Sequence, residues 1–531
     1  MHNSIEQLEI TVLVLAALVV AFGVLARRWH TPYAILLVIG GLLLSLVPTT
    51  PEIKLNPAIV FFGFLPPLLF SAAYNTSWRS FQRNLPSIFL LAFGLVAFTT
   101  VGVALFVHWL IPGLDWRLGL VLGAVLSPTD AVAATSIARR VGLPRRVTDI
   151  LEGESLVNDA SGLLALQFAT AIVVSGATPT ISEGIVKLLY MVTSGIVVGL
   201  AFGGIVHWLE HLIDDAPVEI TITLVVPFAA YLAAEALHSS GVLATVACGL
   251  YLGRQTGHAM SSRSRIDASA VWNTLDFLLN GLVFILIGLQ LRGIMNGIRT
   301  ESHRQLLIDA GLLCAGLILL RLIWEFPGAY LSFAIRRKLG QQEKAPPPRQ
   351  VFIIGWTGMR GVVALAAAFA LPQTIANGQP FPQRNLILFL TFSVILVTLV
   401  LQGLTLPKLI QWLGLAGNRN REEEMQARKA MLESVLAYIG EQRERKPQLV
   451  DVYDEFTRRY ERRLQRLGRD RRPKDKLDPQ HVFREFGLKL RRIERESIRE
   501  MRDRGEIDDN VLRTLEREID LLDARYVDAS D

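Results

Sequence analysis

The chain has 531 residues, of which 51% are hydrophobic and 19% are charged, and its formal net charge at pH 7 is +6. A soluble protein carries about a quarter charged residues, so this composition predicts a membrane protein that also contains a polar part. The net charge is modest, and the basic residues of the apolar part lie mostly in short loops, so they bear on membrane topology rather than nucleic-acid binding. The two cysteines, Cys248 and Cys314, lie in apolar segments without metal-ligand spacing, which is typical of small buried side chains.

The polar part follows the apolar part along the chain. Residues 1–417 are a series of apolar runs, whereas residues 418–531 contain no apolar run long enough to span a membrane. In the second part, apolar residues recur three and four apart between charged ones, which predicts solvated helices or a coiled coil. The basic, proline-broken stretch 469–479 is predicted to be a linker. The sequence therefore predicts a transmembrane domain over 1–417 and a regulatory helical tail over 418–531.

The apolar part contains thirteen candidate membrane-spanning helices. A helix needs about 20 apolar residues to cross the hydrocarbon core of a bilayer. The runs that approach this length are 8–26, 31–48, 57–74, 86–111, 117–138, 147–174, 183–209, 217–237, 240–254, 268–291, 305–335, 349–372 and 385–413. The sequence therefore predicts an all-α polytopic membrane protein whose two termini lie on opposite sides.

The distribution of basic residues predicts the orientation. Alternate loops, such as 139–146 and 336–349, carry most of the arginines and lysines, and such loops face the cytoplasm. The tail is therefore expected in the cytoplasm and the N-terminus outside. Short loops and the absence of a targeting extension favour a prokaryotic cell (inner) membrane.

Acidic residues interrupt the fifth and sixth apolar runs. The fifth contains Ser127-Pro128-Thr129-Asp130, and the sixth contains residues 152–159, which read EGESLVND. A charged group at membrane depth costs at least ~2.5–3.5 kcal/mol, so several together indicate function. Pro128 removes a helical hydrogen bond, which predicts a broken fifth helix whose freed carbonyl groups face a cavity.

The residue types of the sixth run indicate the ligand. Ser155 and Asp159 are four residues apart and share one helix face, and Glu154 and Asn158 share the adjoining face. Hydroxyl, carboxylate and carbonyl oxygens are hard donors that suit sodium or lithium rather than soft metals. The alternative is that these polar residues only hold neighbouring helices together.

A second interruption lies in the twelfth run. Residues 355–361 read GWTGMRG, and three glycines with Arg360 at membrane depth predict an unwound centre. If the first and last six helices form inverted halves joined by the seventh, the fifth helix corresponds to the twelfth. Paired interrupted helices at corresponding positions are typical of a transporter site. Arg360 would offset carbonyl ends or acids where the two breaks cross.

The eleventh run leaves one pairing open. Arg321 and Glu325 are one helical turn apart, so one interpretation is that they pair with each other. The alternative is that Arg321 pairs with Glu154, with Glu325 near the membrane boundary. Asp276 and Glu235 are weaker candidates, interpreted as polar groups near an interface or a cavity.

At these residues the sequence resembles the sodium/proton antiporter family, the electroneutral branch of the monovalent cation:proton antiporters that includes the sodium/hydrogen exchangers. The matching motifs are SPTDAV at 127–132, GESLVNDAS at 153–161 and GMRG at 358–361, and the similarity covers 8–413. The resemblance implies a homodimer with a dimerisation half and a six-helix core, in which helices five and twelve cross as broken helices.

The resemblance also implies an ion site. Asp159 would bind the ion or the proton, Asn158 would be its partner, and Asp130 with Thr129 and Ser155 would complete the site. Asp159 and Asp130 would thus be the principal transport residues, with sodium held by Asp159, Ser155, Thr129 and Asp130.

Three further residues would balance charge in that site. The resemblance implies that Glu154 is a structural acid paired with an arginine, for which Arg321 is favoured, with Arg360 at the crossing. Some prokaryotic members carry an acid on the third helix, and the corresponding stretch 70–74 of this chain has none.

The expected function is antiport of sodium or lithium against protons, with competition at Asp159 and a role in pH homeostasis. Asn158 is neutral where electrogenic relatives carry a second aspartate, so one sodium should exchange for one proton. The alternatives are potassium/proton antiport and, less favoured, anion transport through crossed broken helices. An enzyme is not expected, since the apolar part lacks HExxH, GxSxG and nucleophile–base pairs. No cofactor is expected beyond the transported ions.

Overall fold

The computed structural model describes residues 2–468, except 30, 49–54, 112, 177–179, 214, 260–261, 299–301, 342–344 and 418, together with scattered residues between 490 and 519. The chain forms two compact units, Met1–Asn420 and Arg421–Asp531. Among the residues described, the regular structure is helical apart from one isolated β-bridge between Thr374 and Pro380.

Helices fill the first unit from end to end. In chain order they are α1 (His2–Trp29), α2 (Tyr33–Leu46), η1 (Ile59–Phe64), α3 (Leu65–Asn75), α4 (Trp78–Phe89), η2 (Leu90–Leu95), α5 (Val96–Leu110), α6 (Trp116–Leu126), α7 (Ala131–Val141), α8 (Arg145–Ser175), α9 (Ile181–Glu210), α10 (Ala216–Ala236), α11 (Gly241–Ala259), α12 (Ser262–Leu289), α13 (Leu291–Gly297), α14 (His303–Lys338), α15 (Pro348–Trp356), α16 (Val362–Phe369), α17 (Arg384–Val397), η3 (Thr398–Gln402) and α18 (Gly403–Trp412). The segments η1, η2 and η3 are π-helical turns within longer helices.

Each predicted apolar run falls on one, two or three consecutive segments of this series. Eight helices in the part of the chain that is described, some of them built from consecutive segments, are long and apolar enough to cross a membrane. The predicted all-helical membrane fold is therefore confirmed, while the count of thirteen membrane crossings stays a prediction.

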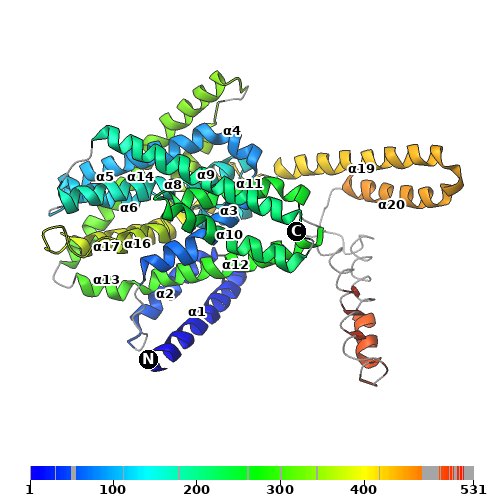
Figure 1. Cartoon of the computed structure of the whole chain (residues 1–531), viewed down its shortest axis with the longest axis horizontal. Helices are drawn as coiled ribbons and strands as arrows, with labels where there is room; N and C mark the ends of the chain where they lie inside the picture. The colour runs from blue at the N-terminus through cyan, green and yellow to red at the C-terminus, as the bar shows by residue number, and fades with distance from the viewer. Residues whose placement is uncertain are drawn as a thin grey trace. The chain divides into compact units, whose positions relative to one another are not determined.

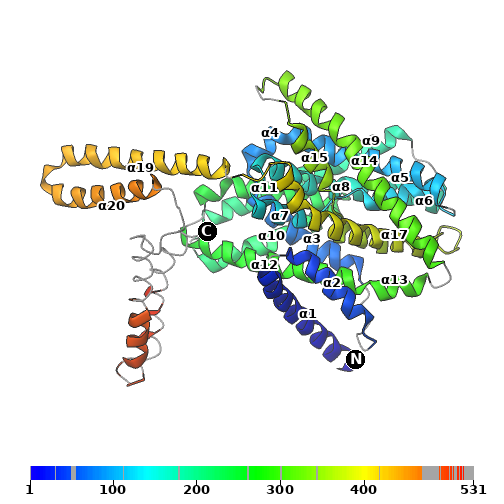
Figure 2. The same cartoon turned by 180° about the vertical axis from the view of Figure 1, so that it is seen from behind.

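The helices of the first unit, which Figures 1 and 2 show from opposite sides, pack in two groups. One group contains α1, α2, α3, α9, α10, α11 and α12, in which α12 lies against α2 and α11 lies against both α3 and α9. The other contains α4 to α8 and α14 to α18, in which α8 lies against α4, α6 and α7, and α14 lies against α5 and α15. We call them the scaffold group and the core group. Helices α3 and α11 of the scaffold group contact α8 of the core group.

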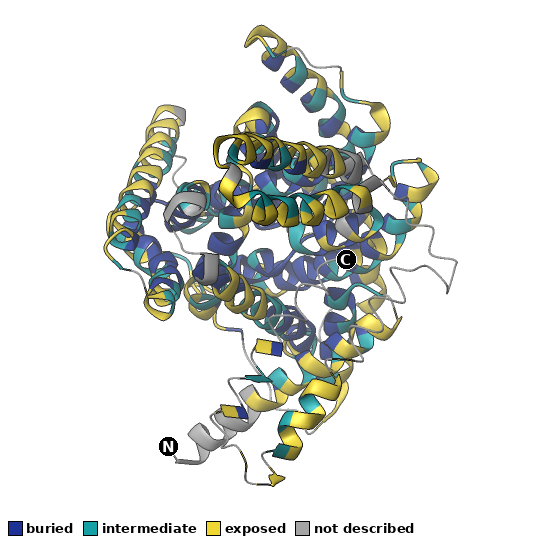
Figure 3. Cartoon of the chain, turned by 90° about the vertical axis from the view of Figure 1, so that its right-hand side faces the viewer, coloured by how far each residue is buried: buried dark blue, intermediate teal, exposed yellow. Residues whose placement is uncertain are grey.

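The outer surface of the first unit is apolar. Large hydrophobic side chains are exposed along α9, among them Val186, Leu189 and Val197. In Figure 3 the buried residues gather in the middle of the bundle, whereas the exposed ones lie on the outer helices. Apolar exposure of this extent is expected for a surface that faces lipid or another protein rather than water.

Both predicted helix breaks are present in the core group. Residues 127–130 separate α6 from α7, and residues 357–361 separate α15 from α16. The two breaks touch, because the backbone N–H of Asp130 donates to the carbonyl of Met359 at 2.8 Å. Gly162 of α8 leaves room for the first break: a Cβ atom there would lie 2.9 Å from Cδ of Pro128. The local sequence signals, proline in one helix and glycines in the other, therefore produce breaks that meet in space.

The second unit begins with a helical hairpin. Helix α19 (Arg419–Arg445) continues through the short turn η4 (Pro447–Leu449) into α20 (Val450–Gly468), and the two helices lie side by side (Figure 1). An ion pair between Arg443 and Asp454, 3.1 Å apart, links them. The predicted linker at 469–479 lies outside the described residues.

Candidate ion-binding site

Asp130 sits where the two broken helices meet. It is the N-cap of α7, and its Oδ1 accepts a hydrogen bond from the backbone N–H of Val132 at 2.8 Å. Its carboxylate also lies against Gly361, which precedes the first residue of α16. The amino ends of two half-helices therefore approach one carboxylate, an arrangement that stabilises negative charge.

The contact with Gly361 predicts that no side chain is tolerated there. A Cβ atom at this position would lie 2.6 Å from Cβ of Asp130, closer than carbon atoms approach in proteins. Gly361→Ala is therefore expected to force the breaks apart, to slow transport, and to destabilise the protein by about 1–3 kcal/mol, as overpacking does. Thermal unfolding in detergent and transport in vesicles would measure both effects. Gly204→Ala on α9 is the matched control, because no atom lies within 4 Å of its added carbon. Equal stability and equal transport in the two variants would contradict the conclusion that the two breaks leave no room for a side chain at Gly361.

Asp159 lies in the middle of α8, beside the first break. Its side chain is only 6% exposed, and among the residues that the structure describes its carboxylate has no hydrogen-bond partner. It lies within electrostatic range of Asp130. A buried carboxylate without a partner is unstable as a bare anion, so it needs a proton or a cation. Asp159 is therefore the group of this site that is free to bind one.

Asn158 and Thr129 tie α8 to the first break. The Asn158 amide donates to Oγ1 of Thr129 at 2.7 Å and to its carbonyl at 3.3 Å. The Thr129 hydroxyl in turn donates to Oε1 of Glu154 at 2.8 Å. Oδ1 of Asn158 is buried and has no donor among the described residues. It is therefore a second oxygen at this site that could accept a hydrogen bond or face a cation.

Glu154 pairs with Arg321, which settles the choice that the sequence left open. The two guanidinium Nη atoms donate to the two carboxylate oxygens at 2.6 and 2.8 Å, and the side chains are 1% and 2% exposed. Arg321 also donates from Nε and Nη2 to the carbonyl of Ile354, near the end of α15, at 3.4 and 3.3 Å. One arginine thus joins α8, α14 and the end of α15. The neighbouring acid Glu325 is buried as well.

Arg360 lies in the second break, and no acid in the described part of the chain bonds to it. Its Nε and Nη1 are buried without a hydrogen-bond partner among the residues described here. Its backbone N–H donates to Oγ1 of Thr398 at 3.2 Å, at the first residue of the π-helical turn η3. Two positions with no local sequence signal thus take part in the break: the Thr398 hydroxyl and the Ile354 carbonyl.

The remaining predicted residues lie at different distances from the break. Oγ of Ser155 accepts from the backbone N–H of Ala131 at 3.3 Å, so it faces the start of α7. Asp276 of α12 lies in the scaffold group, where the Ser71 hydroxyl of α3 donates to it. Glu235 accepts from the backbone N–H of Gly241 at 3.4 Å, near the end of α10. These last two acids therefore make contacts within the scaffold group.

Comparison with known proteins identifies the fold and the family. The chain matches the family described as "Sodium/hydrogen exchanger, transmembrane" over residues 13–412. The chain belongs to the sodium/hydrogen exchanger family. This family consists of membrane transporters rather than enzymes.

Individual exchangers match over much or all of their length. An uncharacterized Na(+)/H(+) exchanger of Mycobacterium tuberculosis is 33% identical, over 98% of this chain and 97% of that protein. The sodium, potassium, lithium and rubidium/H(+) antiporter of Bacillus pumilus is 34% identical, over 76% of this chain and 61% of that protein. Among solved structures, the sodium proton antiporter MjNhaP1 of Methanocaldococcus jannaschii superposes with a TM-score of 0.60 at 20% identity, over 77% of this chain and 98% of that one. The antiporter fold is thereby confirmed.

Within this exchanger, the predicted residues come together in one network. Asp130, Thr129 and Asn158 meet at the first break, and Glu154 continues the network to Arg321. Asp159 lies next to this network without being bonded into it. The structure therefore separates the residues that hold the broken helices from Asp159, which has no hydrogen-bond partner among the described residues.

Proposed function

We propose that the protein exchanges sodium or lithium for protons across a membrane and that Asp159 is the group for which they compete. One observation carries this proposal: Asp159 is buried beside two crossed helix breaks and lacks a hydrogen-bond partner among the described residues. Membership of the sodium/hydrogen exchanger family supports it. The names of the Bacillus antiporter and of the Na(+)/H(+) antiporter ApNhaP of Aphanothece halophytica, 32% identical over 77% of this chain, agree with it.

The neighbours of Asp159 supply further oxygen atoms for a cation. Asp130, Ser155 and the Thr129 carbonyl lie at the break, and Oδ1 of Asn158 has no donor among the described residues. Carboxylate, hydroxyl and carbonyl oxygens suit sodium and lithium. We assign Asp159 as the exchanging group rather than Asp130, because the start of α7 already binds and stabilises the Asp130 carboxylate.

Competition at one carboxylate couples the two ions. Burial disfavours the bare anion of Asp159, whereas either a bound proton or a bound cation removes that cost. Only the loaded forms then change access readily, as the core group moves against the scaffold group. The scaffold group would form the interface of a homodimer in a prokaryotic cell membrane, with the N-terminus outside, a regulatory tail in the cytoplasm, and no cofactor. The physiological role would be pH homeostasis.

The neutral partner Asn158 predicts electroneutral exchange. If one sodium replaces one proton on Asp159, each cycle moves no net charge, so the membrane potential does not alter its free energy. An uncompensated charge would instead gain or lose about 2.3 kcal/mol per 100 mV. Current recorded from protein reconstituted on a solid-supported membrane is expected to stay at background under a sodium gradient, while pH changes show exchange. A steady current that grows with the exchange rate would contradict the 1:1 stoichiometry.

Potassium/proton antiport is the second candidate, because the Bacillus relative is described as accepting sodium, potassium, lithium and rubidium. The test is recovery of the fluorescence of a pH-sensitive dye in energised everted vesicles, adding sodium, lithium and potassium in turn. Recovery with sodium or lithium supports the proposal. Recovery with potassium alone would be consistent with the same binding site but would show that potassium, not sodium, is the transported ion. Chloride-dependent flux without any cation response would instead favour an anion transporter.

A further inference from the structure

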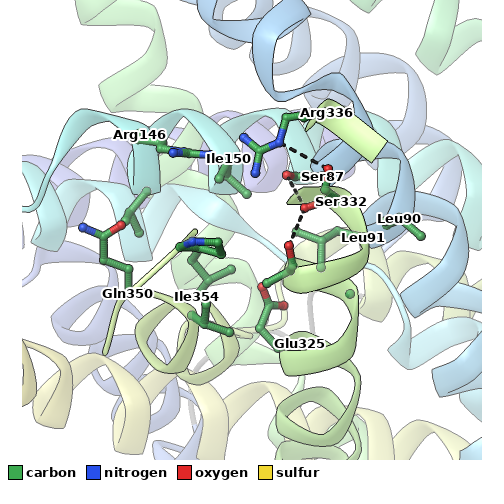
Figure 4. Close-up of a pocket in the computed structure, with 15 residues that line it drawn as sticks. Ser87, Leu90, Leu91, Arg146, Ile150, Glu325, Ser332, Arg336, Gln350 and Ile354 are labelled. Atoms are coloured by element: carbon green, nitrogen blue, oxygen red, sulfur yellow. Dashed lines mark hydrogen bonds between the residues drawn. The ribbon is translucent and has the colours of Figure 1, made fainter. Parts of the chain in front are cut away.

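A small cavity lies inside the core group, apart from the crossed breaks. Its volume is about 30 Å³, and its walls come from α4, η2, α8, α14, α15 and Pro346 before α15. Polar side chains line it, including Ser87 of α4, Glu325, Ser332 and Arg336 of α14, and Gln350 of α15. In Figure 4, Glu325, Ser332 and Ser87 follow one another along one wall. Most of the lining is apolar, and the polar side chains form a small part of its wall.

Glu325 is the one acid on this wall, and it is not satisfied. Its side chain is 2% exposed, and its Oε2 is buried without a hydrogen-bond partner among the described residues. The two hydroxyls above it are linked to each other, since Ser87 donates to Ser332 at 3.1 Å and Ser332 donates to the carbonyl of Ala329 at 2.8 Å. No donor from the described residues therefore reaches this oxygen.

The cavity can supply the missing partner as water. A water molecule needs about 10–15 Å³ of such volume and two to four polar neighbours. The observed volume of about 30 Å³ has room for about two, and the hydroxyls, the Glu325 carboxyl and the guanidinium of Arg336 offer partners. Water in this position would connect Glu325 to the end of the core group that carries Arg336 and Gln350.

The charges that face Glu325 do not neutralise it permanently. Arg321 is one turn away on the same helix, but both of its Nη atoms are bonded to Glu154 of α8. Arg336 of the same helix donates to the Ser332 carbonyl at 3.4 Å, and Arg146 of α8 lies across the cavity. The residues that α4, η2 and α15 contribute to the lining are uncharged. One arginine between two buried acids leaves one negative charge for a proton to remove.

We propose that Glu325 and this hydrated cavity form a second proton-binding site, separate from Asp159. The site takes a proton through water, and the Arg321–Glu154 pair and Thr129 connect it to the first break. When the proton leaves, the Glu325 charge acts on Arg321, Glu154 and Thr129, the network that holds the break beside Asp159. A negative charge inside the core group favours a cation at Asp159.

A direct test measures the carboxyl group itself, in the full-length protein. The variant Asp159→Asn serves as background, so that the transport carboxyl does not contribute. Infrared difference spectra recorded between acid and alkaline pH are expected to show a carboxylic-acid C=O band that shifts in D₂O and disappears on adding Glu325→Gln. Spectra in which Glu325→Gln removes no titrating band overturn the proposal. If the double variant does not fold, Ser332→Val gives the same decision: filling the cavity should slow deuterium exchange of the band, and an unchanged exchange rate overturns the hydrated site.

The effect on transport rests on the proposed function and is measured separately. In otherwise native protein, Glu325→Gln is expected to leave the KM for sodium unchanged at acid pH and to raise it about threefold or more at alkaline pH, where only the native protein gains the charge. Asp309→Asn is the matched control, a buried acid of α14 outside the cavity that accepts from Gln305 at 2.8 Å. An equal rise at every pH would indicate a merely structural role and overturn the proposal. Absence of sodium transport in the native protein would refute the function instead, without affecting the infrared result.

Discussion

Asp159→Asn is expected to abolish cation/proton exchange while leaving the fold intact. Asparagine has nearly the same shape as aspartate but cannot bind a proton at neutral pH or offer a charge to sodium. Asp159 makes no hydrogen bond to the described part of the protein, so its replacement breaks no contact there. Dye-based exchange in everted vesicles should fall to the level of vesicles without the protein, while the melting temperature in detergent stays near the native value.

The matched control for this variant is Glu152→Gln. Glu152 is an acid of the same helix, seven residues before Asp159, and is half-buried. Exchange in the control should remain close to native. Native exchange in Asp159→Asn would remove the central residue of the proposal, whereas loss of exchange in both variants would show only that α8 tolerates no change of charge.

Arg321→Gln is expected to be the most destabilising substitution in the core group. It leaves the Glu154 carboxylate buried and deprives it of both guanidinium hydrogen bonds. Removing one partner of a buried ion pair costs about 3–5 kcal/mol, because the other charge stays desolvated. The melting temperature in detergent should fall markedly, and exchange should be lost along with the break that Thr129 and Ile354 anchor to this pair.

The double variant Glu154→Gln/Arg321→Gln distinguishes the energy of the ion pair from the effects of its two separate side chains. With both charges removed, no bare ion remains, so much of the lost stability should return. The two single variants and the double variant form a cycle from which the coupling energy follows. Additive losses in the double variant would contradict the view that the pair is a single electrostatic unit.

Local signals in the sequence were sufficient to predict the breaks. Pro128 cannot donate a helical hydrogen bond, and the glycines of 355–361 weaken a helix wherever they occur. Helix length follows equally from the apolar runs, because a helix satisfies its own backbone groups and needs no distant partner. For that reason the fold class, the apolar segments and the two interruptions follow from the chain alone.

The partners of charged side chains depended on tertiary structure. Arg321 is four residues from Glu325 and 167 from Glu154, yet it pairs with the distant acid. Sequence spacing specifies which residues share a helix face, but it does not specify which face of another helix lies opposite. The same limit applies to Glu325, whose unpaired oxygen and cavity arise only when α4, α8, α14 and α15 are packed together. The sequence by itself thus determined the helices, their breaks and the set of candidate acids, whereas the packing of helices decided which acid is paired, which caps a helix and which remains free.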